Sequence, residues 1–442
     1  MYGGGPPHHP ARPGYPAPGY PPQGYGHAPP PQAAPPRPPA PPRKRDPEMT
    51  QRSVGKALWL TGMLTGGFLL FRFFLLAPLL YSKNPGLEYS TMLIGAVLAV
   101  PMLAVYIWIP RIVDRYDPEP WWALLLCLSW GAIAACGYSA LINTSIEGWA
   151  YGQTHDKAVA SAVGACLSAP VFEEATKAIA IFFMFYAFRR EFDGVVDGII
   201  YGTFAALGFA ALENVIYYGN AARTEILAHK EGHLETVFLM RGILAPWGHP
   251  LYTSMTGIGF GVARETEKTW LKWLAPLAGY SVAVFMHAVW NTAATVSSGL
   301  VELMLPMWLL TVAGFGVMVV WLVRRKGKII RKNLEDEVLM GYLTMQELDL
   351  VTSPIGWWKA TFSWGGAAGR RFIDAAARLA LSKWHSARAT RAKKATISAD
   401  FVVPLRQDLA KFRAEVSQAL GRQVPQPQAW RPGMPSPLKP GR

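Results

Sequence analysis

The chain has 442 residues, of which 51% are hydrophobic and only 16% are charged, and its formal net charge is +14. The apolar residues gather in runs of about 20, the length that crosses a bilayer as a helix. The positive charge lies near helix ends and in the C-terminal tail, which favours anionic lipid headgroups over nucleic acid as partners. The three cysteines have no metal-binding spacing and indicate no disulfide framework.

Residues 1–50 are dense in proline, glycine and tyrosine. Such a segment buries too little apolar surface to offset its chain entropy, so we predict a disordered cytoplasmic tail. A docking arm for a partner is the alternative. Because Met1 to Lys44 contains no apolar core, we expect the first membrane helix to act as its own insertion signal.

The next part of the chain, residues 57–325, predicts an all-α fold, a polytopic transmembrane bundle of about eight helices. The expected spans are Ala57–Tyr81, Tyr89–Ile109, Trp121–Asn143, Ala160–Phe188, Val196–Tyr218, Gly242–Val262, Leu271–Val296 and Val301–Val323. The remaining residues, 326–442, form a basic and partly helical cytoplasmic tail in this prediction. A group of aromatic residues beside a lysine favours either an interfacial segment or a soluble helical appendage within this tail. It comprises Trp357, Trp358, Lys359 and Trp364.

Loop charge predicts the orientation of the spans. Every second loop is rich in lysine and arginine, which places both termini in the cytoplasm of a multi-pass protein of the inner or plasma membrane. The loop from Gly219 to Arg241 is the least consistent one, because Arg223, Lys230 and Arg241 lie on its expected outer side.

Five polar residues lie within or beside the apolar runs: Glu173, Glu174, Glu213, His249 and His287. A charged side chain at the centre of a bilayer costs about 2.5 kcal/mol or more. A chain keeps such groups only when they are paired, hydrated or used. Glutamates, histidines and an amide are also what a water-activating hydrolase needs, so the sequence predicts an enzyme whose site lies inside the membrane.

The fourth span contains two adjacent glutamates. Glu173 and Glu174 point about 100° apart on a helix, so they cannot share one target. One could act as general base on water while the other holds a neighbour or a metal. Alternatively, Glu173 and Lys177 form a structural ion pair, because they are four residues apart.

The fifth span carries small residues every four positions, which predicts a smooth ridge for close helix packing. These residues are Gly198, Gly202, Ala206 and Ala210. Glu213 and Asn214 follow the ridge, so we expect Glu213 to face a neighbouring helix and not lipid. A hydrogen bond between helices, without chemistry, is the alternative for Glu213.

The last polar residues lie in the sixth and seventh spans. His249 stands between prolines that suggest a helix start, and it could also be an ordinary interfacial residue. His287 and Asn291 are four apart and share one helix face, where they could stabilise a developing oxyanion. His287 could instead be a metal ligand, or form a structural bridge with the amide.

Depth is the argument that joins these residues. At about 1.5 Å per residue, Glu213, His287 and Asn291 lie roughly 25, 24 and 30 Å above the cytoplasmic ends of their spans. His249 lies about 10 Å below the outer end of its own span. This agreement predicts one water-accessible cavity in the outer half of the membrane.

Four short motifs on successive spans resemble those of the PrsW family of intramembrane proteases, relatives of the CAAX-prenyl endopeptidases. They are EExxK at Glu173–Lys177, FxxxEN at Phe209–Asn214, His249, and HxxxN at His287–Asn291. The stretches DPEP at Asp117–Pro120 and DGIIYG at Asp197–Gly202 are also similar. The resemblance covers roughly Ala57 to Val323, and Glu213 departs from the histidine of the prenyl-endopeptidase relatives.

The resemblance implies proteolysis of membrane-embedded or membrane-anchored protein substrates, such as anti-sigma factors, near the outer membrane face. The implied catalytic residues are Glu173, Glu174, Glu213, Asn214, His249, His287 and Asn291. Zinc or another divalent metal could be held by Glu174, His249 and His287, but HExxH is absent and a metal-free mechanism stays open. A proton-coupled transporter and an inactive membrane scaffold are the alternative functions.

Overall fold

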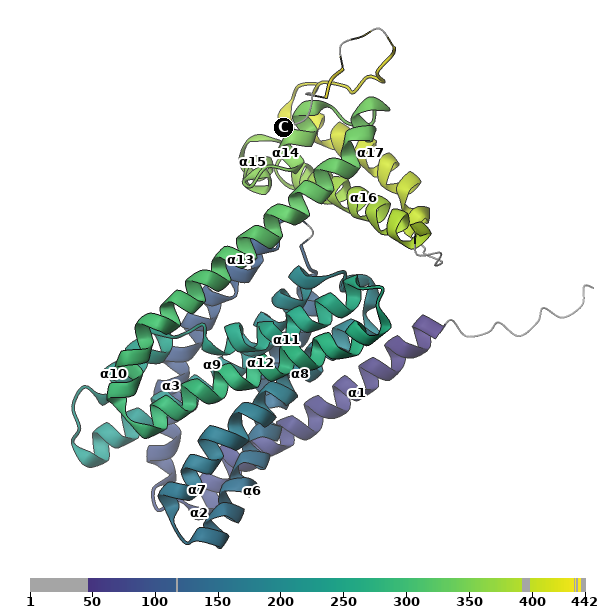
Figure 1. The fold of residues 1–442 in the computed structure, drawn as a ribbon. Coiled ribbons are helices and arrows are strands. Elements are labelled where there is room, and N and C mark those ends of the chain that lie inside the picture. The colour runs from purple at the N-terminus through teal and green to yellow at the C-terminus, as the bar shows by residue number, and fades with distance from the viewer. Residues whose placement is uncertain (1–46, 117, 392–397, 433, 435, 439–442) are drawn as a thin grey trace, which may run out of the picture. The chain divides into compact units, whose positions relative to one another are not determined.

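The computed structural model describes residues 47–116, 118–391, 398–432, 434 and 436–438, and every regular element among them is a helix (Figure 1). The disordered tail expected over residues 1–50 lies outside the described residues, except that 47–50 begin the first helix. The membrane part comprises α1 (Pro47–Leu70), η1 (Phe71–Leu76), α2 (Ala77–Tyr81), α3 (Pro85–Tyr106), α4 (Trp108–Val113), α5 (Trp121–Ser129), η2 (Trp130–Ala135), α6 (Cys136–Thr154), α7 (Lys157–Val163), η3 (Gly164–Ser168), α8 (Ala169–Ala187), η4 (Arg189–Glu191), α9 (Val195–Ala228), α10 (His233–Phe238), η5 (Leu239–Leu244), α11 (Gly248–Glu265), α12 (Thr269–Val296) and α13 (Ser298–Leu339).

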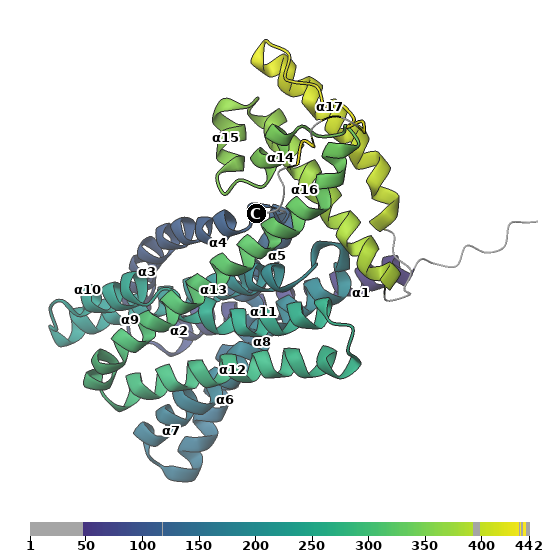
Figure 2. The same ribbon diagram turned by 45° about the horizontal axis from the view of Figure 1, so that its top comes forward.

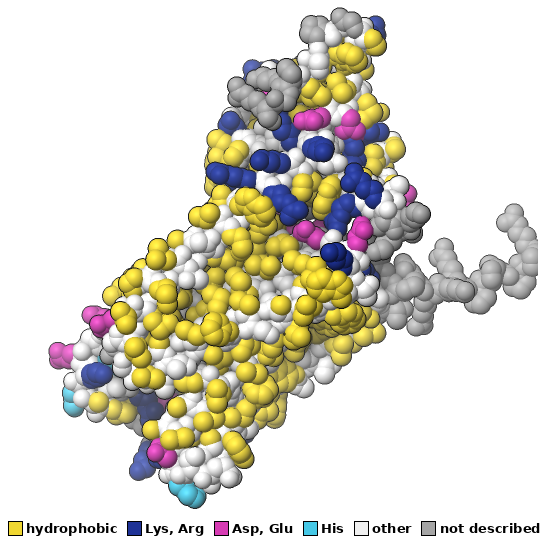
Figure 3. All heavy atoms as spheres, in the orientation of Figure 1, with side chains coloured by type: hydrophobic (Ala, Val, Ile, Leu, Met, Phe, Trp, Pro, Cys, Tyr) yellow, Lys and Arg dark blue, Asp and Glu magenta, His cyan; other side chains and the backbone are white. Residues whose placement is uncertain are grey.

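Seven helical segments within the described residues are long and apolar enough to cross a membrane. They are Gln51–Tyr81, Pro85–Val113, Trp121–Thr154, Lys157–Ala187, Val195–Ala228, Thr269–Val296 and Gly299–Leu339. Figure 3 shows hydrophobic side chains covering much of the visible face of these helices, while lysine and arginine gather over the C-terminal helices. Large apolar side chains such as Phe285 and Leu310, 68% and 73% exposed, therefore have lipid as their natural neighbour.

The expected sixth span, Gly242–Val262, differs from the other seven. Its first part belongs to the π-helical turn η5, and the 18-residue helix α11 follows, packed against both α9 and α12. Because α11 faces protein on both sides, it tolerates the many glycine, serine and threonine residues that lower its hydropathy. It is thus an eighth helix of the bundle that is not among the seven apolar candidates.

Helix α9 packs on α11 through the small residues that the sequence places every four positions. A Cβ atom added at Gly198 would collide with the carbonyl oxygen of Gly257, and one added at Gly257 would collide with the carbonyl of Gly198. Gly202 lies against the backbone of Thr253 in the same way. The close approach of the two backbones brings the polar side chains of α9 and α11 into contact one to three turns further along.

Helix α13 continues without a break from the membrane part to Leu339, across the boundary expected at residue 325. The chain then forms α14 (Met345–Val351), α15 (Gly356–Ser363), α16 (Ala367–Arg391), η6 (Ser398–Phe401) and α17 (Val402–Leu420), seen from two directions in Figures 1 and 2. One buried cluster joins Val195 of α9, Val323 of α13 and Phe372 of α16. The expected basic tail is therefore a packed helical unit whose core is continuous with the membrane helices.

Candidate active site

Helix α8 supplies three ionisable side chains to the interior of the bundle. Glu174 and Lys177 are fully buried and Glu173 is 6% exposed. Pro170 lies in the first turn of α8, directly after the π-helical turn η3, within the continuous helical segment Lys157–Ala187. The three side chains follow within the next two turns.

Glu174 has its carboxylate oxygens occupied by three partners. Its Oε1 accepts a hydrogen bond from the Lys177 ammonium at 2.7 Å and lies 3.1 Å from Nδ1 of His287. Its Oε2 accepts from the Thr253 hydroxyl at 2.7 Å. Partners from α8, α11 and α12 thus compensate this buried charge, and Glu174 holds the three helices together.

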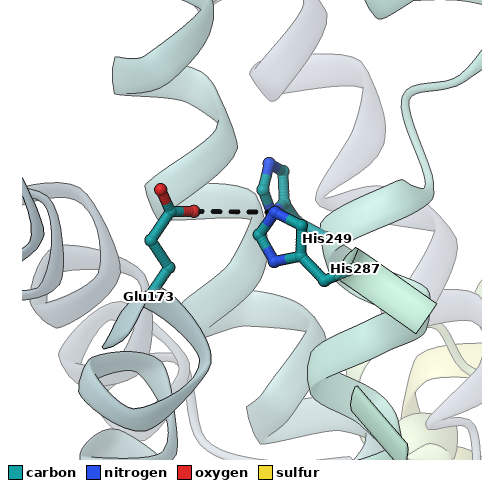
Figure 4. A group of neighbouring side chains, drawn as sticks. All are labelled: Glu173, His249 and His287. Atoms are coloured by element: carbon teal, nitrogen blue, oxygen red, sulfur yellow. Dashed lines mark ion pairs between the residues drawn. The ribbon is translucent and has the colours of Figure 1, made fainter. Parts of the chain in front are cut away.

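Glu173 is less fully engaged than its neighbour. Its Oε1 accepts from the amide of Asn143 at 3.3 Å, and Asn143 in turn accepts from Ser168 at 2.7 Å. Its Oε2 is buried, has no hydrogen-bond partner, and lies 3.9 Å from Nε2 of His287 and 3.8 Å from Nζ of Lys177. Figure 4 shows this carboxylate pointing toward the two imidazoles, so the oxygen that accepts no hydrogen bond faces the histidines.

His249 lies between a cation and an anion. Its Nδ1 is 2.9 Å from the ammonium of Lys177 and its Nε2 is 2.7 Å from Oε2 of Glu213. An ammonium can only donate, so Nδ1 accepts and the ring proton on Nε2 donates to Glu213. The ring is perpendicular to that of His287, with the centroids 5.0 Å apart.

Arg241 completes the polar group from the segment before α11. Its guanidinium donates to Glu213 at 2.5 Å and to the side-chain oxygen of Asn214 at 2.8 Å. Sequence reasoning assigned Arg241 to an outer loop and missed it as a site residue. One sequence signal pointed to Arg241, because its loop was the least consistent with the expected distribution of lysine and arginine. The structure explains this exception, since Arg241 pairs with a glutamate of the bundle.

Asn291 lies on the same helix face as His287 but contacts a different neighbour. Its amide nitrogen donates to the backbone oxygen of Ala165 at 2.9 Å, which ties α12 to η3. This contact uses one of the two N–H groups of the Asn291 amide and leaves the second available as a donor. His287 itself stacks on Tyr252, with ring centroids 5.3 Å apart.

The cluster lies at one depth. Counted along α8, α9, α11 and α12 from their Ala187, Val195, Glu265 and Thr269 ends, four residues lie about 21 to 27 Å in, at 1.5 Å per residue: Glu173, Glu213, His249 and His287. Exposure rises from Glu173 at 8% through His249 at 13% and Glu213 at 18% to Arg241 at 26% of the side chain. Water or substrate would therefore reach Glu173 from the side of Arg241.

One set of donors within the described residues could hold a metal ion. One ligand atom each from Glu173, His249 and His287 lies within 4.8 Å of the others. Two imidazoles and a carboxylate suit a catalytic zinc, and the unpartnered oxygen of Glu173 suits a ligand. Glu174, expected in this set, is instead occupied by its own partners, and His249 would have to exchange Lys177 or Glu213 for the ion.

A bundle of eight helices that encloses acids, imidazoles and a lysine defines a polytopic membrane protein with a candidate hydrolytic centre. Residues 119–323 match the family model described as PrsW family intramembrane metalloprotease. This part of the chain is therefore similar to the PrsW family. The match begins after the first two expected spans, so those spans and the C-terminal helices lie outside it.

Two curated relatives illustrate the extent of the likeness. The chain is 31% identical to Protease PrsW of Geobacillus kaustophilus (strain HTA426) over 30% of this chain and 62% of that protein. It is 30% identical to Protease PrsW of Bacillus subtilis (strain 168) over 37% of this chain and 66% of that protein. The chain thus spans less than two thirds of the length of these relatives. No solved structure matches the chain significantly.

Proposed function

We propose that this chain is an intramembrane peptidase that hydrolyses a peptide bond of a membrane-embedded or membrane-anchored protein. The observation that supports this most is the buried, unpartnered Oε2 of Glu173, which faces two histidines inside a bundle of apolar helices. A buried carboxylate with an open oxygen is suited to take a proton from water. The names of the curated relatives point to the same activity.

In the proposed reaction, Glu173 removes a proton from a water molecule as the water oxygen attacks the carbonyl carbon of the peptide bond. The electron pair of the carbonyl moves to its oxygen, which the second N–H of Asn291 and the Nε2–H of a doubly protonated His287 stabilise. When the C–N bond breaks, Glu173 returns the proton to the leaving amine. Water is consumed, a carboxyl and an amino terminus are formed, and the enzyme is unchanged.

The other ionisable residues are positioning residues in this proposal. Glu174 holds Nδ1 of His287, which leaves Nε2 turned toward Glu173 and the reacting molecule. Glu213 and Lys177 hold both nitrogens of His249, so His249 positions the water by exchanging one of these two contacts for it. Asn214 and Arg241 form the more exposed wall of the cavity. A divalent ion held by Glu173, His249 and His287 would polarise the water or the carbonyl oxygen.

We further propose that cutting takes place near the outer membrane face, in the inner or plasma membrane, with both termini cytoplasmic. The depth of the cluster and the basic loops support this orientation. Anti-sigma-factor-like regulators, which present a membrane-anchored segment at that face, are the proposed substrate class. Residues 57–325 form the proteolytic part, and 326–442 a cytoplasmic appendage.

The test is cleavage in proteoliposomes that contain purified protein and a library of single-span membrane proteins. The wild type is expected to release fragments, and Glu173→Ala is expected to release none at equal membrane abundance. Glu231→Gln, at an exposed glutamate in the turn after α9, is the matched control and should cleave normally. Unchanged cleavage by Glu173→Ala would contradict the assignment of Glu173 as general base. Adding a chelator to the wild-type protein would distinguish a metal-dependent mechanism from a metal-free one.

A further inference from the structure

Helix α15 exposes an apolar face that no described residue covers. Ile355, Trp358 and Phe362 are 53%, 49% and 76% exposed, and their spacing of three and four residues places them on one side of the helix. The rings of Trp358 and Phe362 stack at 5.8 Å. The opposite side of α15 is buried, with Ala360 inaccessible within the core shared with α13. The helix is therefore amphipathic with its apolar side outward.

The position of α15 along the membrane normal follows from contacts of Tyr116. This residue lies in the short loop between the second and third candidate spans, which end at Val113 and begin at Trp121. Its hydroxyl donates to the backbone oxygen of Thr352 at 3.2 Å, four residues before α15. Its ring also lies directly against Gly327, four residues after the buried Val323 of α13. The start of α15 is therefore fixed beside the loop that joins the second and third candidate spans and beside Gly327 of α13.

Lysine and arginine side chains lie on α15 and on the neighbouring helices. Lys359 lies beside Trp358 on the exposed side, and Arg370 is held against α15 by its contact with the Trp357 ring at 5.2 Å and a hydrogen bond to Thr361. Arg324 and Arg325 are exposed where α13 leaves the bundle. Figure 3 shows hydrophobic side chains at the place of α15 with lysine and arginine side chains beside them.

We propose that α15 is an interfacial anchor that rests on the leaflet where α13 leaves the membrane. Ile355, Trp358 and Phe362 enter the boundary between headgroups and acyl chains, where aromatic rings are favoured. Lys359 and the arginines beside it face the phosphates of anionic lipids. This occupant fits because the face is apolar, rimmed by cations, and continuous with a surface that lipid already covers. The proposal does not depend on the peptidase activity.

The test uses the full chain in nanodiscs with a spin label at Phe362→Cys. Cys166→Ala removes the partly accessible natural thiol, which the label would otherwise modify. Cys127 and Cys136 are buried and can stay. The matched control is a label at Ala419→Cys, an exposed residue near the end of α17. Collision with oxygen, which partitions into lipid, is compared with collision with a water-soluble nickel chelate. The ratio of oxygen to nickel collision at residue 362 is expected to exceed that at 419 several-fold.

Two results would overturn the anchor. Equal nickel access at residues 362 and 419 would mean that α15 faces water. Protection of residue 362 from both reagents would mean that protein, such as a second copy of the chain, covers the face. Replacing anionic lipid by zwitterionic lipid, or Lys359 by Glu, is expected to raise nickel access at residue 362. Unchanged nickel access at residue 362 in both cases would show that attraction between these cations and anionic lipid does not contribute to the anchor.

Discussion

The ammonium of Lys177 lies 2.9 Å from Nδ1 of His249, and the two residues come from adjacent helices of the bundle. The same ammonium donates to Glu174 and lies over the ring of Phe209, 4.1 Å from its centroid. Lys177 therefore compensates the buried glutamate pair and fixes the proton of His249 on Nε2. A single lysine thus connects the two glutamates of α8 with the histidine of α11.

Lys177→Met is expected to lower the stability of the protein by about 3–5 kcal/mol, because it removes the cation that compensates the buried carboxylate of Glu174. Thermal unfolding in detergent would measure the effect. Lys230→Met, at an exposed lysine after α9, is the control and should leave the unfolding temperature unchanged. A stable Lys177→Met protein would show that Glu174 does not need this partner.

Glu173→Gln and Glu174→Gln are expected to have opposite consequences. Because one oxygen of Glu173 has no partner, its replacement should leave the unfolding temperature nearly unchanged while cleavage falls about 10²–10⁴-fold, the contribution of a general base. Glu174→Gln removes the charge that binds Lys177 and should lower the unfolding temperature. Cleavage rates and unfolding curves of the two proteins, measured side by side, check this contrast; two variants with equal unfolding temperatures would contradict it.

Arg241 and Glu213 are expected to be energetically coupled. A cycle of Arg241→Gln, Glu213→Gln and the double variant should give a coupling energy of about 0.5–3 kcal/mol, as for groups in direct contact. The single Arg241 variant should be the less stable one, because it leaves the Glu213 carboxylate in the bundle without its guanidinium partner. Additive effects on the unfolding temperature would show that the contact contributes nothing.

Gly198→Ala is expected to cost about 1–3 kcal/mol, because the added methyl group collides with the backbone of Gly257 and forces α9 and α11 apart. Gly148→Ala is the matched control, since open space surrounds that helical glycine. It should be neutral or stabilising by up to about 1 kcal/mol. Unfolding temperatures of the two variants in one detergent provide the comparison, and equal values would contradict the close packing.

Two ion pairs of the C-terminal helices are expected to differ in strength. Arg413 makes two hydrogen bonds to Glu347 at 2.6 and 2.9 Å, and both side chains are buried. Arg413→Met should therefore cost about 3–5 kcal/mol. Arg331 and Asp349 form an exposed pair at 2.8 Å, so Arg331→Met should change stability by about 1 kcal/mol or less. Hydrogen exchange of α14 and α17 measures both.

The members of the polar cluster could be predicted because ionisable groups are conspicuous in apolar runs. Glu173, Glu174 and His287 are all buried in the structure, and the small-residue spacing of α9 indicated where a helix packs. Their partners on other helices could not be predicted, since helix order does not say which faces meet. Thr253, which donates to Glu174, is one of many threonines in apolar segments and carries no signal of its own.

The helical content of the C-terminal region could also be predicted from its composition, but its packing could not. A sequence rich in Lys, Arg, Ala and Leu is compatible with a solvated helix as well as with a folded unit. Leu334 and Leu379 are inaccessible in the structure because helices α13 and α16 cover each other. That pairing depends on residues 45 positions apart, which local patterns do not connect.

The core that joins Val195 and Ile199 of α9 with Val323 and Phe372 has a consequence for biogenesis. Because α14 to α17 follow α13 in the chain, the part of this core that faces α9 can be covered only after α9 and α13 have been inserted and have met. Until then, that part remains open to chaperones and proteases. Protease resistance of the C-terminal helices in newly made protein would therefore report that insertion of the bundle is complete.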